Sequence, residues 1–317
     1  MILRRELADQ VAAIANVTDI AGGVTAEAAA ACGLLEGTPV IVGTGDSTAE
    51  SIAGGLVSPG TLFVQFGSTM FYIYCLEGQM DACTADHFPG SYPFTIPGSY
   101  AATGGTNCAG TLTKWVRDLY YAQEVQAARH GGPDAYSVMA QEAAQVPPGS
   151  NGLIMLPYFY GERSPINDTN ARGTFIGMTM DTSRSDLVQA VLEGVAFAIR
   201  DSLEVARSLG LDIPSTKICG GGAKSPLWRK MIANILNIRV CVLDKEEGPS
   251  LGAAMLAAVG TGAYETVEAA AGQIVHVVDT IEPDAEIAAR YEEKYRQFQQ
   301  IYPALKPVFD SIAQSSF

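Results

Sequence analysis

The sequence predicts an α/β fold in which a mixed sheet, part of it parallel, is flanked by helices. Strands and helices alternate in four segments of the C-terminal half: strand 216–219, helix 226–236, strand 240–243 and helix 250–259. A helix over 185–209 carries an apolar face that must pack against another element. Two runs rich in aromatic and β-branched residues, 61–66 and 70–76, are separated by Gly67-Ser68-Thr69, which indicates a hairpin.

The N-terminal part of the chain predicts helices. Residues 1–36 are expected to form one or two Ala-rich helices, because Leu7, Val11 and Ile14 lie at helical spacing and Gly22-Gly23 interrupts the pattern. These residues make a poor domain by themselves.

The middle of the chain predicts a buried strand, a loop and several helices. Val40–Val42 is apolar enough for a buried strand, and 49–53 continues as a short helix. Residues 81–105 are rich in proline, glycine and aromatic residues, which favours a structured surface loop. Ser183 and Asp186 fit a capping box at the start of the long helix. The other expected elements are helices from near 110, over 135–145 and over 284–302, and a short strand over 152–156.

The composition indicates a globular protein whose partners are small molecules. Its 317 residues suffice for about two domains, and 48% hydrophobic with 17% charged residues is an ordinary globular balance. A formal net charge of −14 argues against nonspecific nucleic-acid binding and leaves no basic patch for an anionic membrane. A bound phosphate would therefore be held locally, by backbone amides and a few cations.

The cysteines and histidines do not show the spacing of a metal site. The six cysteines contain no CxxC pair and lie mostly among apolar or small neighbours, so buried reduced thiols are expected. The three histidines are scattered, without nearby carboxylates or cysteines suited to zinc. The N-terminus lacks a signal-peptide core, and no apolar run approaches the roughly 20 residues that span a bilayer. A cytoplasmic protein is therefore expected.

An acid lies on a glycine-flanked turn after the expected strand at 40–42. The stretch PVIVGTGDSTAESIAGG places Asp46 after Gly43 and Gly45, which permit backbone angles or close approaches that a Cβ would obstruct. Asp46 could accept a proton or hold a metal-bound water at a cleft. Alternatively, Asp46 or Ser47 could cap the first free amides of the next helix, and the motif alone favours this cap.

Three consecutive glycines between the strand at 216–219 and the helix at 226–236 form the strongest local signal. Gly220–Gly222 permit the close approach of a ring or a phosphate, while helix-start amides and Lys224 supply positive potential. The motif matches neither a Walker loop nor the dinucleotide GxGxxG. The alternative is a tight strand-to-helix crossover in which small residues serve packing only.

Two further stretches could contribute to a site. The Gly67-Ser68-Thr69 turn could point amides and hydroxyls at an anion, although most such turns are only turns. The stretch GERSPINDTNARG crowds four charged residues into a loop beside an expected strand end: Glu162, Arg163, Asp168 and Arg172. This loop could brace a cleft, or it could be a solvated ion-pair loop.

These pieces, in this order, resemble the FGGY family of carbohydrate kinases, nearest its xylulokinase branch. The family's C-terminal signature is matched by Gly173-Thr174-Phe175-Ile176-Gly177-Met178, then seven residues, then Asp186-Leu187 and Ala190-Val191-Leu192-Glu193. PYFYGERSP before this signature and GGGAKSPLWRKMIANIL after it extend the resemblance. The fold that it implies is the actin-like, ribonuclease H-like ATPase fold. The activity that it implies is phosphorylation of a sugar hydroxyl by ATP with Mg²⁺, the sugar being a ketopentose such as D-xylulose.

The resemblance also implies roles for individual residues. Asp46 is expected to be the general base that takes the proton from the sugar hydroxyl, and to meet Mg²⁺ through a bound water. The Gly67-Ser68-Thr69 turn resembles the family's Gly-Thr-Ser phosphate loop with its last two residues exchanged. Gly110 corresponds to a second phosphate-contacting glycine, and Lys114 to a polar residue that contacts the nucleotide. The adenosine-binding turn is expected at Gly221, Gly222, Ala223 and Lys224.

The resemblance covers essentially all of this chain but only about the C-terminal three-fifths of such a kinase. Residues 1–55 resemble the tail of the N-terminal sugar-kinase domain, including the catalytic turn, and 56–317 resemble the C-terminal nucleotide-binding domain. Because phosphoryl transfer depends mostly on positioning and charge stabilisation, we expect this chain alone to bind nucleotide weakly with little or no turnover.

The expected partners are a sugar and ATP, without nucleic acid or membrane, and a homodimer is one possible assembly. A noncatalytic nucleotide- or sugar-sensing module is the alternative. A glycoside hydrolase is poorly supported, because the sequence pairs no second acid with Asp46.

Overall fold

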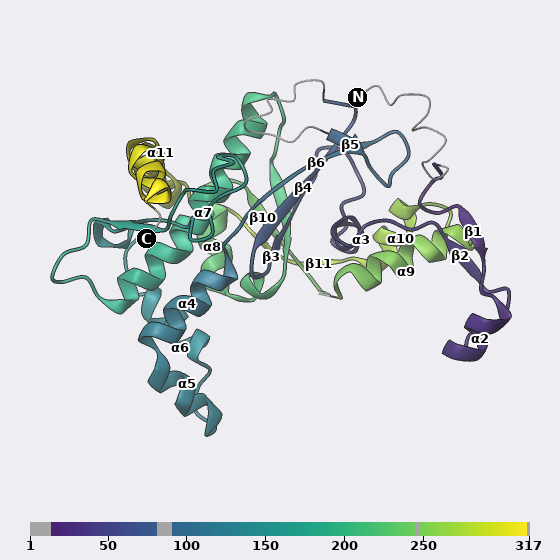
Figure 1. Cartoon of the computed structure of the whole chain (residues 1–317), viewed down its shortest axis with the longest axis horizontal. Coiled ribbons are helices and arrows are strands. Elements are labelled where there is room, and N and C mark those ends of the chain that lie inside the picture. Colours follow the sequence, from purple (N-terminus) through teal and green to yellow (C-terminus); the bar gives the residue numbers. More distant parts are fainter. Residues whose placement is uncertain (1–13, 81–90, 245–246, 316–317) are drawn as a thin grey trace. The chain divides into compact units, whose positions relative to one another are not determined.

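The computed structural model of the chain describes residues 14–80, 91–244 and 247–315 (Figure 1). They fall into two compact units: unit 1 takes its residues from 1–55 and 247–274, and unit 2 from 56–246 and 275–317. In the described part of the chain, each helix is too short or too polar to cross a membrane.

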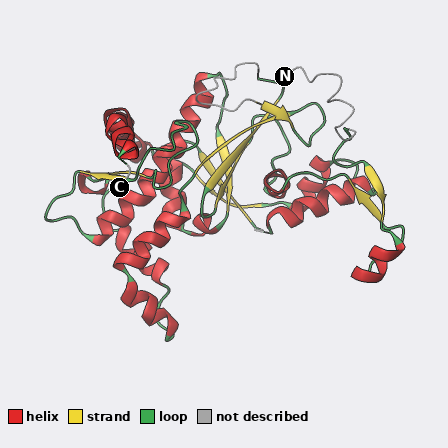
Figure 2. Ribbon diagram, viewed as in Figure 1, coloured by secondary structure: helices red, strands yellow, loops and turns green. Residues whose placement is uncertain are grey.

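Unit 2 is built on a seven-stranded mixed sheet, whose strands are the yellow arrows that converge in the centre of Figure 2. In spatial order the strands are β11 (Val277–Ile281), β10 (Arg239–Leu243), β9 (Ser215–Cys219), β3 (Leu62–Phe66), β4 (Met70–Leu76), β6 (Tyr100–Thr106) and β5 (Ser91–Pro93). β3, β9 and β10 are parallel, with Val64 opposite Ile218 and Ile218 opposite Val242. β4 is antiparallel to both β3 and β6, so β6 runs in the same direction as β3. The expected hairpin and the partly parallel sheet are both confirmed.

The long helix α7 (Arg184–Ser208) is buried along most of its length and packs against α8 (Pro226–Leu236). Its predicted capping box is confirmed: the Ser183 hydroxyl accepts a hydrogen bond from the Asp186 amide at 3.2 Å, and the Asp186 carboxylate accepts one from the Ser183 amide at 2.7 Å. Shorter elements complete the unit: α4 (Gly110–Tyr120), α5 (Ala122–Arg129), α6 (Ala135–Ala143), the 3-10 turns η1 (Ser150–Gly152) and η2 (Gly221–Lys224), and the antiparallel pair β7 (Ile154–Leu156) and β8 (Thr174–Ile176).

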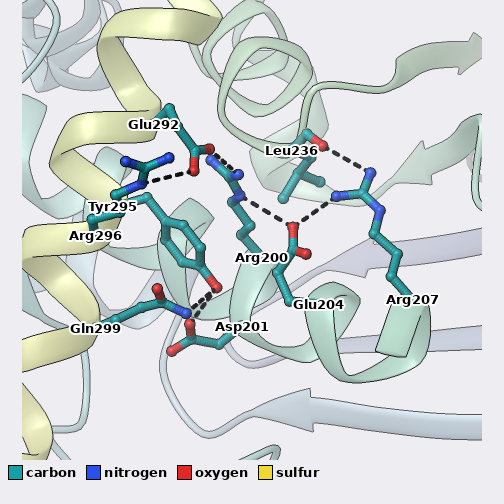
Figure 3. A network of polar contacts seen from close by, with 9 residues as sticks. All are labelled: Arg200, Asp201, Glu204, Arg207, Leu236, Glu292, Tyr295, Arg296 and Gln299. Atoms are coloured by element: carbon teal, nitrogen blue, oxygen red, sulfur yellow. Dashed lines mark hydrogen bonds and ion pairs between the residues drawn. The ribbon is translucent and has the colours of Figure 1, made fainter. Parts of the chain in front are cut away.

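The last helix, α11 (Ala285–Gln314), packs on α7 through aromatic and charged side chains. We call this contact the α7–α11 layer; its members are Glu193, Phe197, Arg200, Asp201, Glu204, Tyr291, Glu292, Tyr295 and Phe298. Figure 3 shows its polar half, in which Arg200 lies between Glu204 of its own helix and Glu292 of α11. The Arg200 guanidinium also lies 4.1 Å from the centre of the Tyr295 ring. Charge pairing and ring packing therefore act on the same pair of helices.

Unit 1 is held together by close helix packing and a small sheet. Its elements are β1 (Ile20–Gly23), α2 (Ala26–Cys32), β2 (Pro39–Ile41), α3 (Asp46–Ala53), α9 (Gly248–Gly260) and α10 (Val267–Ile274), with β1 and β2 antiparallel. A Cβ added to Gly252 would lie 1.8 Å from the Ala49 carbonyl oxygen. The backbones of α3 and α9 thus touch, and this contact explains the small residues in both helices.

Several expectations from the sequence are wrong. The surface loop expected over 81–105 instead contains β5 and most of β6, because β6 pairs along its whole length with β4 and β5 pairs with β6. Ile20–Gly23 is a strand although helix was expected; Leu7 and Val11 lie outside the described residues. The strand at Val40 is not buried, since this side chain is 45% exposed.

The α11 helix and the cysteines also depart from expectation. The helix continues past Pro303 and Pro307, where it was expected to end, and its buried stripe extends to Phe309. Three of the cysteines are buried as expected, namely Cys75, Cys108 and Cys219, whereas Cys32 is exposed. Cys83 lies outside the described residues.

Candidate active site

Three strands of unit 2 deliver glycine-containing turns to one edge of the sheet. β3, β6 and β9 run in the same direction, so their carboxyl ends lie at the same edge. We call the three turns that follow them the glycine edge: Gly67–Thr69 after β3, Asn107–Gly110 after β6 and Gly220–Lys224 after β9. Ligands of open α/β sheets bind outside the carboxyl ends of strands. The structure thus brings together most of the residues that the sequence predicted to bind nucleotide.

The turn after β3 and the start of α4 are locked by backbone hydrogen bonds. The Gly110 amide donates to the Gly67 carbonyl at 3.0 Å, and the amides of Ala109 and Thr111 donate to the Ser68 carbonyl at 3.0 and 3.1 Å. A Cβ on Gly110 would lie 2.6 Å from the Gly67 carbonyl oxygen, so this crossing requires glycine. Packing therefore accounts for Gly110, and these helix-start amides already have protein partners.

The remaining polar groups of this turn face outward. The side chains of Ser68 and Thr69 are exposed, so two hydroxyls are accessible where the hairpin turns. Lys114 lies on α4 one turn after Gly110 and is also exposed. Residues four apart on a helix share a face, so the ammonium group and the turn lie on the same side of α4.

The three glycines after β9 differ in what surrounds them. Gly220 has φ 90° and its added Cβ would lie 2.5 Å from the Phe66 carbonyl oxygen. A Cβ on Gly222 would lie 2.6 Å from the ring of Trp228, which is itself buried. A Cβ on Gly221 would meet nothing within 4 Å. The packing alternative accounts for Gly220 and Gly222, but it leaves Gly221 unexplained.

The end of this turn is also partly structural. Ala223 is 4% exposed, so its methyl group faces the protein interior and not the outside of the edge. Lys224 is exposed, and Ser225 caps α8 by accepting a hydrogen bond from the Trp228 amide at 3.3 Å. Of the predicted adenosine-binding residues, Gly221 and Lys224 are accessible, whereas Ala223 is not.

Glu162 lies beneath the glycine edge and contacts the turn after β6. Its Oε1 accepts hydrogen bonds from the Asn107 amide at 3.1 Å and from the Arg163 amide at 2.7 Å. The side chain is only 3% exposed, and this burial raises the pKa of the carboxyl to about 8. The idea that this loop is a solvated ion-pair loop is wrong for Glu162, which forms no ion pair among the described residues.

Of the other charged residues, Asp168 connects the loop to α11, where Lys306 Nζ lies 3.8 Å from its carboxylate, and Arg172 holds the loop itself. Asp168 accepts a hydrogen bond from the Tyr302 hydroxyl at 2.7 Å, and Arg172 donates to the carbonyls of Thr169 and Ala171 at 2.9 Å. The sequence singled out the charged loop but not the contact between Glu162 and Asn107. No sequence pattern identifies that pair, because the two residues come together only through the strand pairing of β6.

Asp46 is the first residue of α3 in unit 1, and its side chain is exposed. The N-cap is Gly45, so neither Asp46 nor Ser47 occupies the cap position that the alternative assigned. Asp46 Oδ1 nevertheless accepts a hydrogen bond from the Ser47 amide at 2.7 Å, as a capping carboxylate would.

The turn that carries Asp46 offers few ligands for a metal ion. Within the described ranges, no group of three or more His, Cys, Asp or Glu side chains could hold a metal ion. Mg²⁺ retains several waters and uses one or two carboxylates together with substrate phosphates. A single exposed carboxylate such as Asp46 therefore fits contact through a metal-bound water.

Comparisons with known proteins match the arrangement. The model of the C-terminal domain of the FGGY family of carbohydrate kinases matches residues 62–261. The chain is 32% identical to the xylulose kinase of Staphylococcus epidermidis over 285 residues, which are 90% of this chain and 55% of that enzyme. It is 28% identical to the gluconokinase of Bacillus subtilis, over 84% of this chain and 52% of that enzyme. The chain thus spans about half the length of these relatives.

A solved structure agrees in both fold and sequence. The xylulose kinase of Rhodospirillum rubrum superposes with a TM-score of 0.82 at 31% identity, over 93% of this chain and 57% of that enzyme. The described mixed sheet with its covering helices is therefore the actin-like ATPase fold of these kinases. The chain belongs to the FGGY family of carbohydrate kinases, and the part of the family that it matches is the C-terminal domain.

Proposed function

We propose that this chain carries the nucleotide site and the general base of a kinase that transfers the γ-phosphoryl group of ATP to a sugar hydroxyl. Family membership supports the reaction class. A ketopentose such as D-xylulose is the proposed acceptor, because several relatives at about 32% identity are named xylulose kinase. Relatives named ribulokinase and gluconokinase are 28% identical to the chain, so the acceptor is the finer part of this proposal.

In this proposal two parts of the sequence divide the work. Residues 1–55 are the tail of a sugar-kinase domain and present Asp46, which takes the proton from the attacking hydroxyl. Residues 56–317 hold the nucleotide: the exposed hydroxyls of Ser68 and Thr69 meet the phosphates, and Gly221 with Lys224 meets adenosine. Mg²⁺ bound with ATP would neutralise charge on the β- and γ-phosphate oxygens.

In this proposal three small residues support the site through packing and do not contact the nucleotide: Gly110, Gly222 and Ala223. Their small size lets the turns pack closely, as the contacts of Gly110 with Gly67 and of Gly222 with Trp228 require. Lys114 is retained as a nucleotide contact, because it is exposed on the same helix face as Gly110. Close turn packing would pre-form the edge before nucleotide arrives, which lowers the entropy cost of binding.

Gly221 carries the proposal, because it is an exposed glycine of the glycine edge that packing does not require. A side chain there would project into the space in which the adenosine is proposed to lie. In Gly221→Leu, the dissociation constant for MgADP should rise at least about tenfold, as calorimetric titration of the 317-residue chain would show. The matched control is Gly272→Leu, at an exposed glycine of α10 that also has nothing within 4 Å of its added Cβ. If the two variants bind MgADP with equal affinity, the assignment of adenosine binding to the Gly220–Lys224 turn is wrong.

Asp46 is tested by separating binding from turnover. Any ATP-dependent phosphorylation of D-xylulose, D-ribulose or D-gluconate should fall by about 10²–10⁴ in Asp46→Asn, since a general base contributes roughly this factor. Its MgADP affinity should equal that of the unmodified chain, because the carboxylate acts on the sugar hydroxyl. Unchanged turnover in Asp46→Asn would exclude Asp46 as the base.

A further inference from the structure

Glu162 is connected to the Gly67–Thr69 turn by a short path of backbone contacts. Its carboxylate holds the Asn107 amide at 3.1 Å, directly before the segment that starts α4. Two and three residues later, the amides of Ala109 and Gly110 bind the carbonyls of Ser68 and Gly67. A displacement of Asn107 would therefore change the position of the turn that carries Ser68.

The loop that carries Glu162 is itself fixed. The backbones of Glu162 and Asp168 exchange two hydrogen bonds, at 2.8 and 2.9 Å. The Asn107 side-chain amide donates to the carbonyls of Tyr160 and Gly161 at 3.2 and 3.3 Å. Among the described residues, Glu162 thus supplies the one carboxylate in an otherwise neutral set of hydrogen bonds between this loop and the glycine edge.

We propose that Glu162 is a positioning residue of the nucleotide site: its carboxylate sets the path of Asn107, and thereby the placement of Gly110 and the Gly67–Thr69 turn against the phosphates. This inference rests on the proposed function and adds to it a residue that touches neither substrate. Its Oε2 is buried without a hydrogen-bond partner among the described residues, as is the Tyr72 hydroxyl. A carboxylate that served stability alone would have both oxygens paired, because an unpaired buried acceptor destabilises the fold.

Among the titratable groups that surround it, Glu162 is the one whose pKa lies near neutral pH. The groups that face it are Tyr72 from β4, Tyr158 after β7, Cys108 before α4 and Arg163 of its own loop. Burial raises the pKa of each of the two phenols and of the Cys108 thiol above its ordinary value. Burial raises the pKa of Glu162 to about 8, and the amides of Arg163 and Asn107 and the charge of Arg163 act against this rise.

The positioning role predicts a sign for the pH dependence of binding. An ionised carboxylate accepts the Asn107 amide more strongly than the neutral acid does. Nucleotide affinity should therefore increase as Glu162 ionises, and bound nucleotide should in turn favour its ionised form, since linkage is reciprocal. A purely structural role gives the opposite trend, because ionising this buried group destabilises the fold.

The test is the MgADP affinity of the 317-residue chain across pH, with calorimetry as the readout. The unmodified chain should bind at least about threefold more tightly at about pH 9 than at about pH 7, as Glu162 ionises. Glu162→Gln keeps the shape of the side chain and one acceptor oxygen. Its affinity for MgADP should not depend on pH in this range. Asp201→Asn is the matched control, since burial raises the pKa of Asp201 to about 6 but the hydrogen bonds of Asn107 go to Glu162, Tyr160 and Gly161. A Glu162→Gln profile that follows the unmodified chain would overturn the proposal.

A second readout separates this inference from the proposed function. If the unmodified chain fails to bind MgADP at any pH, the proposed nucleotide site is wrong. The positioning role is then decided by amide hydrogen exchange of 107–111 at about pH 9, corrected for intrinsic rates. Faster exchange there in Glu162→Gln, with unchanged exchange in α7, supports the role. Equal protection of 107–111 in the two proteins overturns it.

Discussion

The glycine edge and the α7–α11 layer are both rich in polar groups, but they differ in how these groups are paired. In the layer, the buried Glu193 has both oxygens occupied: Oε1 accepts from the Gly149 amide, Gln189 and the Tyr291 hydroxyl at 2.8, 3.1 and 2.9 Å, and Oε2 accepts from the Ser150 hydroxyl at 2.8 Å. At the glycine edge, the equally buried Glu162 has one oxygen unpaired.

The exposed polar groups of the α7–α11 layer and the glycine edge also differ in how they are paired. In the layer, Arg200 lies between Glu204 and Glu292, so even its outer members meet opposite charges (Figure 3). At the edge, the side chains of Ser68 and Thr69 face outward, and Gly221 borders open space. Burial and polarity alone do not separate a structural network from a ligand site. The pairing of the buried carboxylates differs between the two regions, although Gln189 Oε1 beside Glu193 is also buried without a partner among the described residues.

The largest expected effect is in the layer. Glu193→Ala should lower the free energy of unfolding by about 3–5 kcal/mol, because it removes the acceptor of several buried donors at once. The control is Glu204→Ala, whose side chain is 36% exposed and whose loss should cost about 1 kcal/mol or less. Urea unfolding followed by circular dichroism measures both. Similar losses in the two variants would mean that the buried pairing does not dominate the stability of the layer.

The next effect concerns Glu162 at the glycine edge, and it predicts the direction in which the free energy of unfolding changes with pH. The pKa of Glu162 is about 8 in the folded chain, against an ordinary value of 4.5. The folded state therefore holds this proton over a pH range in which the unfolded state has lost it. Stability from this group is complete below about pH 4.5 and is lost as pH rises through about 8, by at most about 5 kcal/mol.

Glu162→Gln removes this dependence. Between about pH 5 and pH 9, the unmodified chain should lose more stability than the variant, because only the former must ionise a buried carboxyl. Urea unfolding of both proteins at the two pH values measures the difference. Parallel losses would show that the carboxyl is hydrated or paired in solution, and the contrast with Glu193 would then disappear.

Much of this contrast could not be derived from the sequence, although the elements could. The hairpin, the capping box at Ser183 and the limits of α8 follow from local patterns, and each is confirmed. The strand β6 does not, because YAATGGT contains no apolar β-branched residue and becomes a strand only by pairing with β4. Tertiary pairing overrides weak local preference in such segments.

The candidate site shows the same limit at the level of single residues. The three glycines after β9 are identical as letters, yet Gly220 and Gly222 face Phe66 and Trp228, while Gly221 faces open space. The family resemblance located the turn but could not assign a different task to each glycine. Likewise, the partner of Glu162 is Asn107, far away in the chain, and only the fold brings the two together.

The smallest expected effect tests the layer at one hydrogen bond. The Tyr295 hydroxyl donates to Asp201 Oδ1 at 2.6 Å and accepts from the Gln299 side chain at 2.9 Å. Burial raises the pKa of Asp201 to about 6, and the bond from Tyr295 is the first of the interactions that act against this rise. Tyr295→Phe should therefore cost about 1.5–3 kcal/mol at about pH 8, where Asp201 is ionised, and about 1 kcal/mol at about pH 5.

The pH dependence of this cost is what distinguishes paired charge from packing. The phenyl ring of the variant retains the contacts with Phe197 and with the Arg200 guanidinium, so lost packing is excluded as the main cause. Tyr136→Phe is the control, because it removes an exposed hydroxyl that meets only Arg117 at 3.0 Å among the described residues, and should change stability by less than about 0.5 kcal/mol. A cost for Tyr295→Phe of about 1 kcal/mol at both pH values would mean that Asp201 holds its proton throughout this range. The layer would then contain a neutral acid, like the one that Glu162 forms at the glycine edge below its pKa.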